Sequence, residues 1–392
     1  MSHRIIAGTV LLLSFVTQTL PAHAQSLVGQ LGTLLTEQRG STPTLIPDLA
    51  AATATATTVA GLFSVELSTL PLASSSGGFV YRLDPTLGVV SRTSDAFGPF
   101  FTERVLQNSR GQSSVGLSFQ VSEFSSLQGA DLQTGSFPTN AARRVGETTP
   151  FSVDSLDLEL RSASATFFTS YGITDRLTIS GIVPVERVTF SGQRFRTTSG
   201  VVSLQSSQSG SAAGLGDVAI QGRYLLAGSP LRGMALGSDL RLPTGREEDL
   251  LGSGHTSARA LAIGSWEEGA LAMHANGGVG FGGASREYFW SGAATVAAAP
   301  RLTLVGEVMG RRLAELSLVQ DVYQPHPLMP GVDTMRWLPV ERGVHSTFFV
   351  TGAKWNVASS WLVNANLLVR VTDAGLRARV TPAISIDYSF EQ

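Results

Sequence analysis

Charged and amide side chains recur at alternate positions within otherwise apolar segments of this chain. The residues concerned are Asp217, Arg223, Asp239, Arg241, Glu307, Arg311, Asn364, Asn366, Arg370, Arg377, Arg379 and Asp387. Successive side chains of a β-strand point to opposite faces, so residues spaced in this way share one face. We expect these side chains to line a water-filled lumen.

Three of these residues are arginines close to the C-terminus. Arg370, Arg377 and Arg379 lie on the polar faces of the last two predicted strands, on either side of a short loop at 372–375. We expect them to cluster near the outer mouth of the lumen, where they could attract anionic solutes as charged rings do in selective pores. The alternative is that they pair with lumen acids such as Glu307, because buried charges generally need partners.

Histidine and serine give little support for catalysis. His255, His274, His326 and His345 are the histidines beyond the N-terminal leader, and three of them lie in or beside predicted loops. No serine lies in the Gly-x-Ser-x-Gly turn of hydrolases. His274 is expected to face the lumen, where a hydrogen-bonded lining residue is the commoner role. The sequence therefore predicts that the protein is not an enzyme.

The sequence also predicts no cofactor and no metal site. Residues 278–283 match the dinucleotide pattern G-x-G-x-x-G, but no helix follows them. The histidines and acids show no recognisable ligand spacing. Cysteine is absent, which excludes disulfides and thiolate ligands.

The elements that must position the polar side chains are strands. From residue 376 to 390, apolar residues alternate with mostly polar ones, and the segment ends on Phe390. One apolar face, one polar face and an aromatic end are typical of a strand between lipid and the lumen of a barrel. About twelve such strands are predicted, at 112–123, 155–171, 176–190, 214–226, 232–243, 256–266, 269–281, 287–299, 302–314, 344–357, 360–372 and 375–390. The predicted fold is an all-β, antiparallel transmembrane β-barrel of about 12 strands, with 14 as the alternative.

The connections alternate in length. Short turns are separated by long polar loops at about 191–213, 244–255 and 315–343. Outer-membrane barrels have short periplasmic turns and longer extracellular loops, so an even strand number places the end of the chain in the periplasm. A soluble β-sandwich has no reason to sort its loops by length.

The N-terminus predicts export. Arg4 precedes an apolar stretch from Ile5 to Val16, and Ala22-His23-Ala24 forms a cleavage pattern. That stretch is too short to span a bilayer as a helix, and no later run reaches the roughly 18 apolar residues needed. Any membrane span must therefore consist of strands. We expect cleavage after Ala24 and localisation in the outer membrane of a Gram-negative-type bacterium.

The segment between the leader and the barrel is irregular. Leu31, Leu34 and Leu35 suggest a short helix, the Ala/Thr run 50–60 a flexible link, and residues 77–106 a small hairpin. This segment is expected to plug the lumen, to lie in the periplasm, or to add two strands. The expected organisation is a signal peptide at 1–24, an N-terminal segment at 25–106 and a barrel at 107–392.

Several stretches resemble a known family. Gly214-Leu215-Gly216-Asp217, the segment 240–245 and the segment 170–176 look like outer-membrane transporters labelled phenol-degradation meta-pathway proteins. The stretch 79–88 with Glu103-Arg104 is similar to their N-terminal region. The resemblance implies a relation to the long-chain fatty-acid transporters, and hence passage of hydrophobic or aromatic small molecules.

These observations predict a monomeric outer-membrane channel for passive passage of small hydrophobic or aromatic molecules. Its expected partners are outer-membrane lipid, a small-molecule solute and the barrel-assembly machinery. A formal net charge of −2 argues against nucleic acid. The alternatives are a structural or surface-display barrel whose extracellular loops bind a partner and, with least support, a membrane-embedded hydrolase.

Overall fold

The computed structural model describes residues 25–39, 45–71, 81–84, 89–92, 94–105, 108–283, 285–314, 318–340, 343–358 and 360–390. The predicted signal peptide, with its cleavage after Ala24, lies outside the described residues, which begin at Gln25.

Twelve antiparallel strands close into a barrel, as predicted. The wall strands are β3 (Ser113–Leu127), β6 (Ser152–Gly172), β7 (Leu177–Thr198), β9 (Ala219–Gly228), β10 (Arg232–Arg241), β11 (Ser257–Glu268), β12 (Leu271–Gly282), β13 (Glu287–Ala299), β14 (Leu302–Leu313), β17 (Val344–Ala358), β18 (Trp361–Arg370) and β20 (Val380–Phe390). The last strand pairs with the first, from Ala383 opposite Gln120 to Phe390 opposite Ser113. This closure removes the unpaired sheet edge that a lipid environment would not tolerate.

The predicted N-terminal hairpin does not add two strands to the wall. Strands β1 (Tyr81–Asp84) and β2 (Val89–Arg92) pair only with each other, in a separate two-stranded sheet. The structure therefore decides between the two predicted strand numbers in favour of 12.

The two faces of the wall differ as the alternation predicts. On β10, Met234, Leu236 and Leu240 are exposed on the outer face, whereas Asp239 between them is buried on the inner face. The same phase holds along β18, where Trp361 and Leu367 are exposed and Asn364 is buried. The apolar residues thus form an outer belt, and the polar residues face the lumen.

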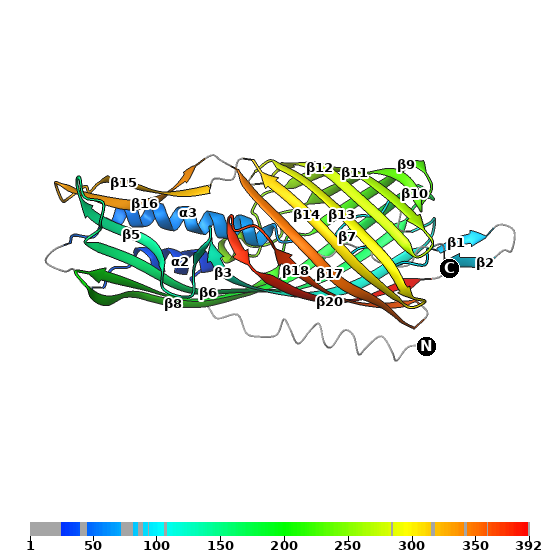
Figure 1. The fold of residues 1–392 in the computed structure, drawn as a ribbon, viewed down its shortest axis with the longest axis horizontal. Helices are drawn as coiled ribbons and strands as arrows, with labels where there is room; N and C mark the ends of the chain where they lie inside the picture. The colour runs from blue at the N-terminus through cyan, green and yellow to red at the C-terminus, as the bar shows by residue number, and fades with distance from the viewer. Residues whose placement is uncertain are drawn as a thin grey trace.

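A second group of strands extends the barrel at one end (Figure 1). We call it the sleeve: it consists of the outer parts of β6 and β7 with β4 (Ala130–Asp131), β5 (Phe137–Arg144), β8 (Val201–Leu215), β15 (Leu318–Pro325) and β16 (Val332–Val340). The short connections between wall strands lie at the opposite end, where the chain also terminates (Figure 1).

Two of the predicted long loops are instead largely strands of the sleeve. Residues 191–213 belong largely to β7 and β8, and residues 315–343 contain the hairpin of β15 and β16. Their polar sequences still form strands because β8 pairs along the outer half of β7, and β16 pairs with β5. The third segment, 244–255, is a loop with one 3₁₀ turn, η2 (Glu247–Asp249).

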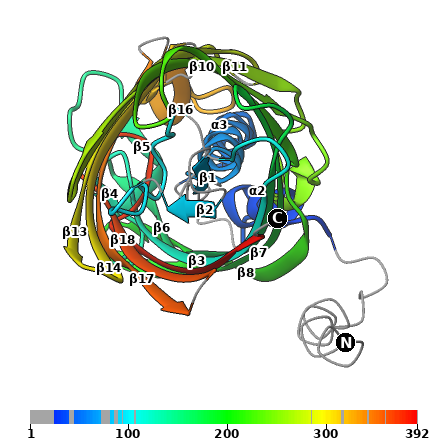
Figure 2. The same ribbon diagram turned by 90° about the vertical axis from the view of Figure 1, so that its right-hand side faces the viewer.

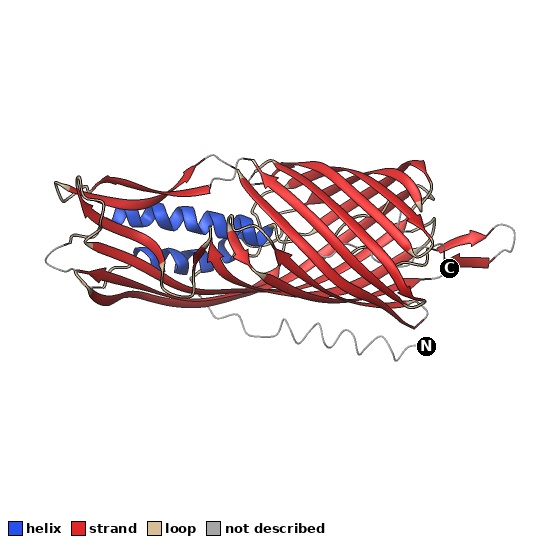
Figure 3. Cartoon of the chain, in the orientation of Figure 1, coloured by secondary structure: helices blue, strands red, loops and turns tan. Residues whose placement is uncertain are grey.

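Two helices lie inside the ring of strands (Figures 2 and 3). The short helix α2 (Leu27–Thr36) buries Leu27, Leu31, Leu34 and Leu35, close to the prediction. The longer helix α3 (Leu49–Ser68) contains the Ala/Thr run, so the predicted flexible link is wrong. Alanine has the highest helix propensity, and Thr58 satisfies its hydroxyl on the Ala54 carbonyl. Packing of α3 against β16 and α2 further stabilises this helix.

Contrary to the prediction that no run after the leader could span a bilayer, helix α3 has the length and composition of a membrane-crossing helix over an 18-residue stretch. Half of that stretch is buried against the rest of the protein. Its apolar side chains pack with those of α2 and of the inner faces of β3, β6 and β7 in one hydrophobic core. The interior of the sleeve is therefore apolar, in contrast to the polar interior of the barrel.

The last strand segment departs from the prediction at Arg379. Leu376 and Ala378, in the short strand β19 (Leu376–Ala378), are buried in the sleeve core, while Arg379 and Val380 are both exposed. The alternation therefore changes phase here, and the residues from 376 to 390 do not share one lipid-facing side. Because β19 faces an apolar core, its inner residues look like lipid-facing ones in the sequence.

Candidate functional site

Residues 94–105 run through the lumen near the end that carries the C-terminus, and we call them the inner segment. Its backbone amides bind the carboxylate of Glu307 on β14: Phe101 and Thr102 donate to Oε2 at 3.1 and 2.9 Å, and Phe100 donates to Oε1. The buried Nζ of Lys354 donates to the Pro99 carbonyl at 2.8 Å. The carboxylate of Glu307, which was predicted to line the lumen, thus accepts hydrogen bonds from the backbone of the inner segment.

Two buried ion pairs fix the inner segment further. Arg104 binds Glu267 on β11 at 2.8 Å, and Glu103 binds the predicted lumen residue Arg223 on β9 at 2.9 Å. All four side chains are buried or nearly so. Removing one partner from such a pair leaves a buried charge without compensation, so these contacts hold the segment in one position.

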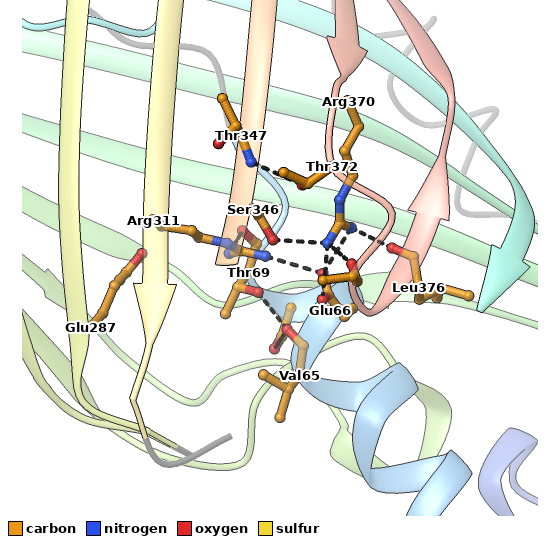
Figure 4. A network of polar contacts seen from close by, with 12 residues as sticks. Val65, Glu66, Thr69, Glu287, Arg311, Ser346, Thr347, Arg370, Thr372 and Leu376 are labelled. Carbon is orange, nitrogen blue, oxygen red and sulfur yellow. Dashed lines mark hydrogen bonds and ion pairs between the residues drawn. The ribbon is translucent and has the colours of Figure 1, made fainter. Parts of the chain in front are cut away.

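At the opposite side of the lumen, arginines of the wall hold the C-terminal end of α3 (Figure 4). Arg241 on β10 donates to the Ser68 carbonyl at 3.0 Å, and Arg311 on β14 donates to the Thr69 carbonyl at 2.6 Å. The last carbonyls of a helix lack partners within the helix and carry partial negative charge, which a guanidinium satisfies.

A single carboxylate on α3 joins two of these arginines. Glu66, which is 1% exposed, binds Arg311 at 3.1 Å and Arg370 on β18 at 3.2 Å (Figure 4). Arg370 also donates to the Ser346 hydroxyl and to carbonyls of the loop after β18. We call Arg241, Arg311 and Arg370 the arginine clamp, because they bind the last turn of α3 from three strands.

Between the end of α3 and the inner segment lies a cavity of about 150 Å³, which we call the chamber. Thr69, Leu70 and Pro71 line one side of it, and Phe101 and Glu103 line the opposite side. Apolar groups from the wall complete it, among them Leu261, Ile263, Phe289, Met309 and Phe348. Cavities of about 150 Å³ accept one benzene molecule.

Inner-face glycines shape the chamber wall. A Cβ on Gly237 would lie 3.0 Å from the Ile263 side chain, and a Cβ on Gly278 would lie 2.6 Å from the Phe289 ring. Gly280 lies between Arg259 and Glu287, which bind each other at 2.8 Å across β12. These glycines leave room for the large side chains of the neighbouring strands.

The charges of the chamber are unevenly paired. Arg223, Arg259 and Arg311 each bind a carboxylate, whereas the Arg241 guanidinium makes a single hydrogen bond, to Ser68, and no ion pair with any described residue. Asp239 is directly opposite Arg259 in the β10–β11 register, and its Oδ1 has no hydrogen-bond partner.

The remaining predicted lumen residues have other environments. Asn364 on β18 donates to Asp387 on β20 at 2.8 Å, and Asn366 on the same inner face is also buried. Asp217 instead anchors the loop 244–255, because it accepts from the Gly245 and Ser253 amides. These contacts give Asn364, Asp387 and Asp217 partners within the chain.

The three C-terminal arginines do not lie together in the lumen. Arg377 points away from the buried side chains of Leu376 and Ala378, and it binds Asp373. Arg379 is exposed beside the phase change, and its carbonyl accepts from the Arg370 amide. Of the three, only Arg370 faces the interior.

Glu66, Phe289 and Lys354 were not predicted as site residues. Glu66 had a usable signal, since it is the single charged residue within the apolar stretch 49–68. An isolated charge in an apolar helix commonly has a buried partner. Phe289 is inward-facing in a strand whose outward residues are also aromatic, so alternation alone could not distinguish it.

The sleeve repeats the arrangement found at the end of α3. Arg194 on β7 donates to the Leu34 carbonyl at 3.0 Å and to the Glu37 carbonyl, and Asp154 binds both Arg194 and Arg196. A hydrogen bond from the Ser206 hydroxyl lowers the pKa of Glu37. The C-terminal end of α2 is thus also bound by wall arginines.

A serine and a histidine form a pair near the inner segment. Ser265 and His274 lie 2.9 Å apart through Nδ1, and both are buried. The Ser265 hydroxyl also accepts from the Val105 amide, and Nε2 of His274 has no hydrogen-bond partner. No carboxylate of a described residue hydrogen-bonds to this histidine, so the pair lacks the third group of a catalytic triad. In the described chain, no three histidines or acids are grouped as metal ligands.

Part of this chain is similar to a known protein family. The model of the family described as "Putative MetA-pathway of phenol degradation" matches residues 138–311. No relative among curated proteins matches the chain.

Solved structures that match the chain include two toluene transporters and a porin. The toluene transporter TodX of P. putida has 10% identity and a TM-score of 0.31, over 72% of this chain and 90% of that one. The toluene transporter TbuX of Ralstonia pickettii has 9% identity and a TM-score of 0.28, over the same shares. The KdgM porin has 10% identity and a TM-score of 0.35, over 61% of this chain and 99% of that one. At TM-scores below 0.5, these similarities carry no functional information.

The family match covers wall and sleeve strands from β5 to β14, where the resemblance in the turns was found. Over residues 138–311, which form much of the closed twelve-stranded barrel, this chain is similar to that family.

Proposed function

We propose that this protein is a monomeric outer-membrane channel for passive passage of small hydrophobic or aromatic molecules. It is exported with cleavage after Ala24 and inserted by the barrel-assembly machinery, and residues 25–106 serve as its plug. The observation that carries the proposal is the chamber. It has the volume of one aromatic ring and lies inside a polar lumen, between α3 and the inner segment.

The path requires two movements of the plug. A solute from the outside must pass the end of α3, which the arginine clamp holds, and then the inner segment, which Glu307 and two ion pairs hold. Both obstructions are bound by polar contacts to the wall and not by covalent links. No energy-coupling element is recognisable in the described chain, so movement follows the concentration gradient.

Filling the chamber provides the test. Gly237→Leu places a side chain against Ile263, inside the chamber. Gly306→Leu is the matched control, because Gly306 alternates with the inward residues of β14 and a Cβ there meets no atom within 4 Å. Both variants are expressed in Gram-negative cells that lack their own porins, and uptake of radiolabelled toluene is measured.

We expect uptake in the Gly237→Leu cells to fall at least fivefold towards that of cells without the protein, and uptake in the Gly306→Leu cells to equal that of the wild type. Equal uptake by cells with the wild type, with either variant and without the protein would contradict the channel. Heat-modifiable migration in gels confirms that both variants fold.

The display function remains the second candidate, favoured by the contacts that hold the inner segment at Glu307, Glu267 and Arg223. A display barrel needs a lumen that stays closed, so wild-type cells would then take up no more toluene than empty cells. The incomplete Ser265–His274 pair gives no support to a hydrolase, and we propose no catalytic role.

A further inference from the structure

We propose that the chamber selects aromatic carboxylates, with Arg241 binding the carboxylate and the phenylalanines of the wall receiving the ring. This inference rests on the proposed function and names the class of solute that the chamber binds best. Three features of the chamber carry it: its size and lining, the pairing of its charges, and the group that now occupies Arg241.

The lining fits a single aromatic ring. Phe101, Phe289 and Phe348 come from the inner segment, β13 and β17, so aromatic faces border the cavity from three elements. Met309 and Ile263 add flexible apolar contacts. Aromatic pairs gain energy beyond their buried area when rings stack with an offset or meet edge to face. A cavity of about 150 Å³ holds one ring but not two.

The pairing of the chamber charges distinguishes Arg241 from the other arginines. Arg223, Arg241, Arg259 and Arg311 line it, against the three carboxylates Glu103, Asp239 and Glu287. Arg223 binds Glu103, Arg259 binds Glu287, and Arg311 binds Glu66, which lies outside the lining. Arg241 and Asp239 are thus the charged lining residues without an ion pair among the described residues. Asp239 is opposite Arg259 in the strand register, which places its charge beside a second arginine. Arg241 is therefore the arginine of the chamber that can bind a carboxylate without giving up an ion pair.

Arg241 also has hydrogen-bonding capacity to spare. A guanidinium carries five N–H donors, and in the described chain Arg241 uses one of them, towards the Ser68 carbonyl. Its remaining donors can form the bidentate pair that arginine makes with a carboxylate. That pair would lie at the chamber edge where α3 ends, with the ring directed towards Phe289.

The present partner of Arg241 is a weaker acceptor than a solute carboxylate. The Ser68 carbonyl is neutral, and charge-assisted hydrogen bonds are roughly twice as strong as neutral ones. A carboxylate that enters the chamber therefore competes with the last turn of α3 for Arg241. Solute binding should loosen that turn, which gives the inference a second, independent readout.

Calorimetry on the refolded full chain tests the assignment, with benzoate and benzyl alcohol as matched probes that differ in charge. The variant is Arg241→Gln, and Arg232→Gln is its control on the same strand, because Arg232 is about half exposed and pairs with Glu268 at the surface. We expect wild-type protein and Arg232→Gln to bind benzoate at least tenfold more tightly than benzyl alcohol. In Arg241→Gln, this preference should disappear while affinity for benzyl alcohol stays within twofold.

Hydrogen exchange supplies the second readout. Saturating benzoate should increase amide exchange in residues 64–70 of the wild type, and benzyl alcohol should not. The assignment is wrong if the wild type shows no preference for benzoate or if Arg241→Gln retains the preference. Phe289→Leu, which removes a ring but no charge, should weaken both probes and keeps the test valid if Arg241→Gln does not fold.

The experiments distinguish a failure of this inference from a failure of the proposed channel function. Binding of both probes with equal affinity would overturn the anion preference and leave the channel standing. Preferential benzoate binding by the refolded protein, together with no solute uptake by cells that express it, would overturn the channel and leave a binding site.

Discussion

At the scale of single residues, arginine has a particular use in this protein. Arg194 binds carbonyls at the end of α2, and Arg241 and Arg311 bind carbonyls at the end of α3. A planar guanidinium can satisfy two acceptors at once, which a lysine ammonium does with less geometric definition. Both helices are thereby held to strands far away in the sequence.

Glu66 is the residue on which the position of α3 depends most. Glu66→Gln leaves Arg311 and Arg370 buried without the charge that they share, so we expect a loss of about 3–5 kcal/mol of docking free energy for the end of α3. Hydrogen exchange of residues 60–68 measures this loss.

The control is Glu268→Gln, which makes the same substitution in an exposed pair with Arg232. An exposed ion pair contributes at most about 1 kcal/mol, so exchange in α3 should not change. Equal protection of α3 in both variants would show that Glu66 does not hold the helix.

The sequence predicted some of these side chains and missed their partners. Alternation predicted an inward Arg370, but its partner Glu66 is 304 residues away, in a segment interpreted as a plug preceded by a link. Arg377 and Arg379 were placed with Arg370 because alternation from 376 to 390 looks unbroken. The phase change at Arg379 leaves no trace in the pattern, since the sleeve core and the lipid both favour apolar residues.

At the scale of elements, α3 combines weak sequence signals with strong structural support. Its alanines and threonines give no apolar face, which is why the segment looked like a link. Its N-cap Asp48 accepts from the Ala51 amide at 3.0 Å, and the same carboxylate binds Thr334 and Arg336 on β16. The cap thus also attaches the helix to the sleeve.

Removal of this cap should affect more than the helix end. Asp48→Ala is expected to cost about 2–4 kcal/mol, because the loss of a cap, typically about 1 kcal/mol, adds to the loss of a charge-assisted contact to Arg336. Ser26→Ala removes the N-cap of α2. Among the described residues, the Ser26 hydroxyl accepts only from the Gly29 amide. This substitution should cost about 1 kcal/mol.

Chemical denaturation of the two variants in detergent compares these losses. Equal destabilisation by Asp48→Ala and Ser26→Ala would mean that the contacts of Asp48 with β16 contribute nothing.

At the scale of the whole molecule, the chain has two tubes with different interiors. The barrel has an apolar outer belt and a polar lumen, whereas the sleeve surrounds an apolar core of helices. Strand number and most wall strands were predictable, because period-two alternation is strict where lipid meets water. The sleeve strands were not, since we expect neither of their faces to contact lipid.

The position of the membrane belt can be tested by one charged substitution at two sites. Leu236→Arg places a charge on the outer face of β10, where we expect a cost of about 2–4 kcal/mol if the site lies at the bilayer midplane. Val201→Arg makes a comparable change at an exposed position of the sleeve and should cost less than about 0.5 kcal/mol. Reversible folding into lipid vesicles measures both, and equal costs would contradict the assigned belt.

Single-channel conductance in a planar bilayer tests the central claim most directly, with mature full-length protein compared with a variant that lacks residues 25–106. We predict rare, brief openings for the full chain, because the arginine clamp and the inner segment close the lumen at two levels. The shortened variant should conduct steadily, since its lumen retains the polar wall without the plug. An absence of conductance in both proteins, with the barrel folded in each, would contradict a plugged channel.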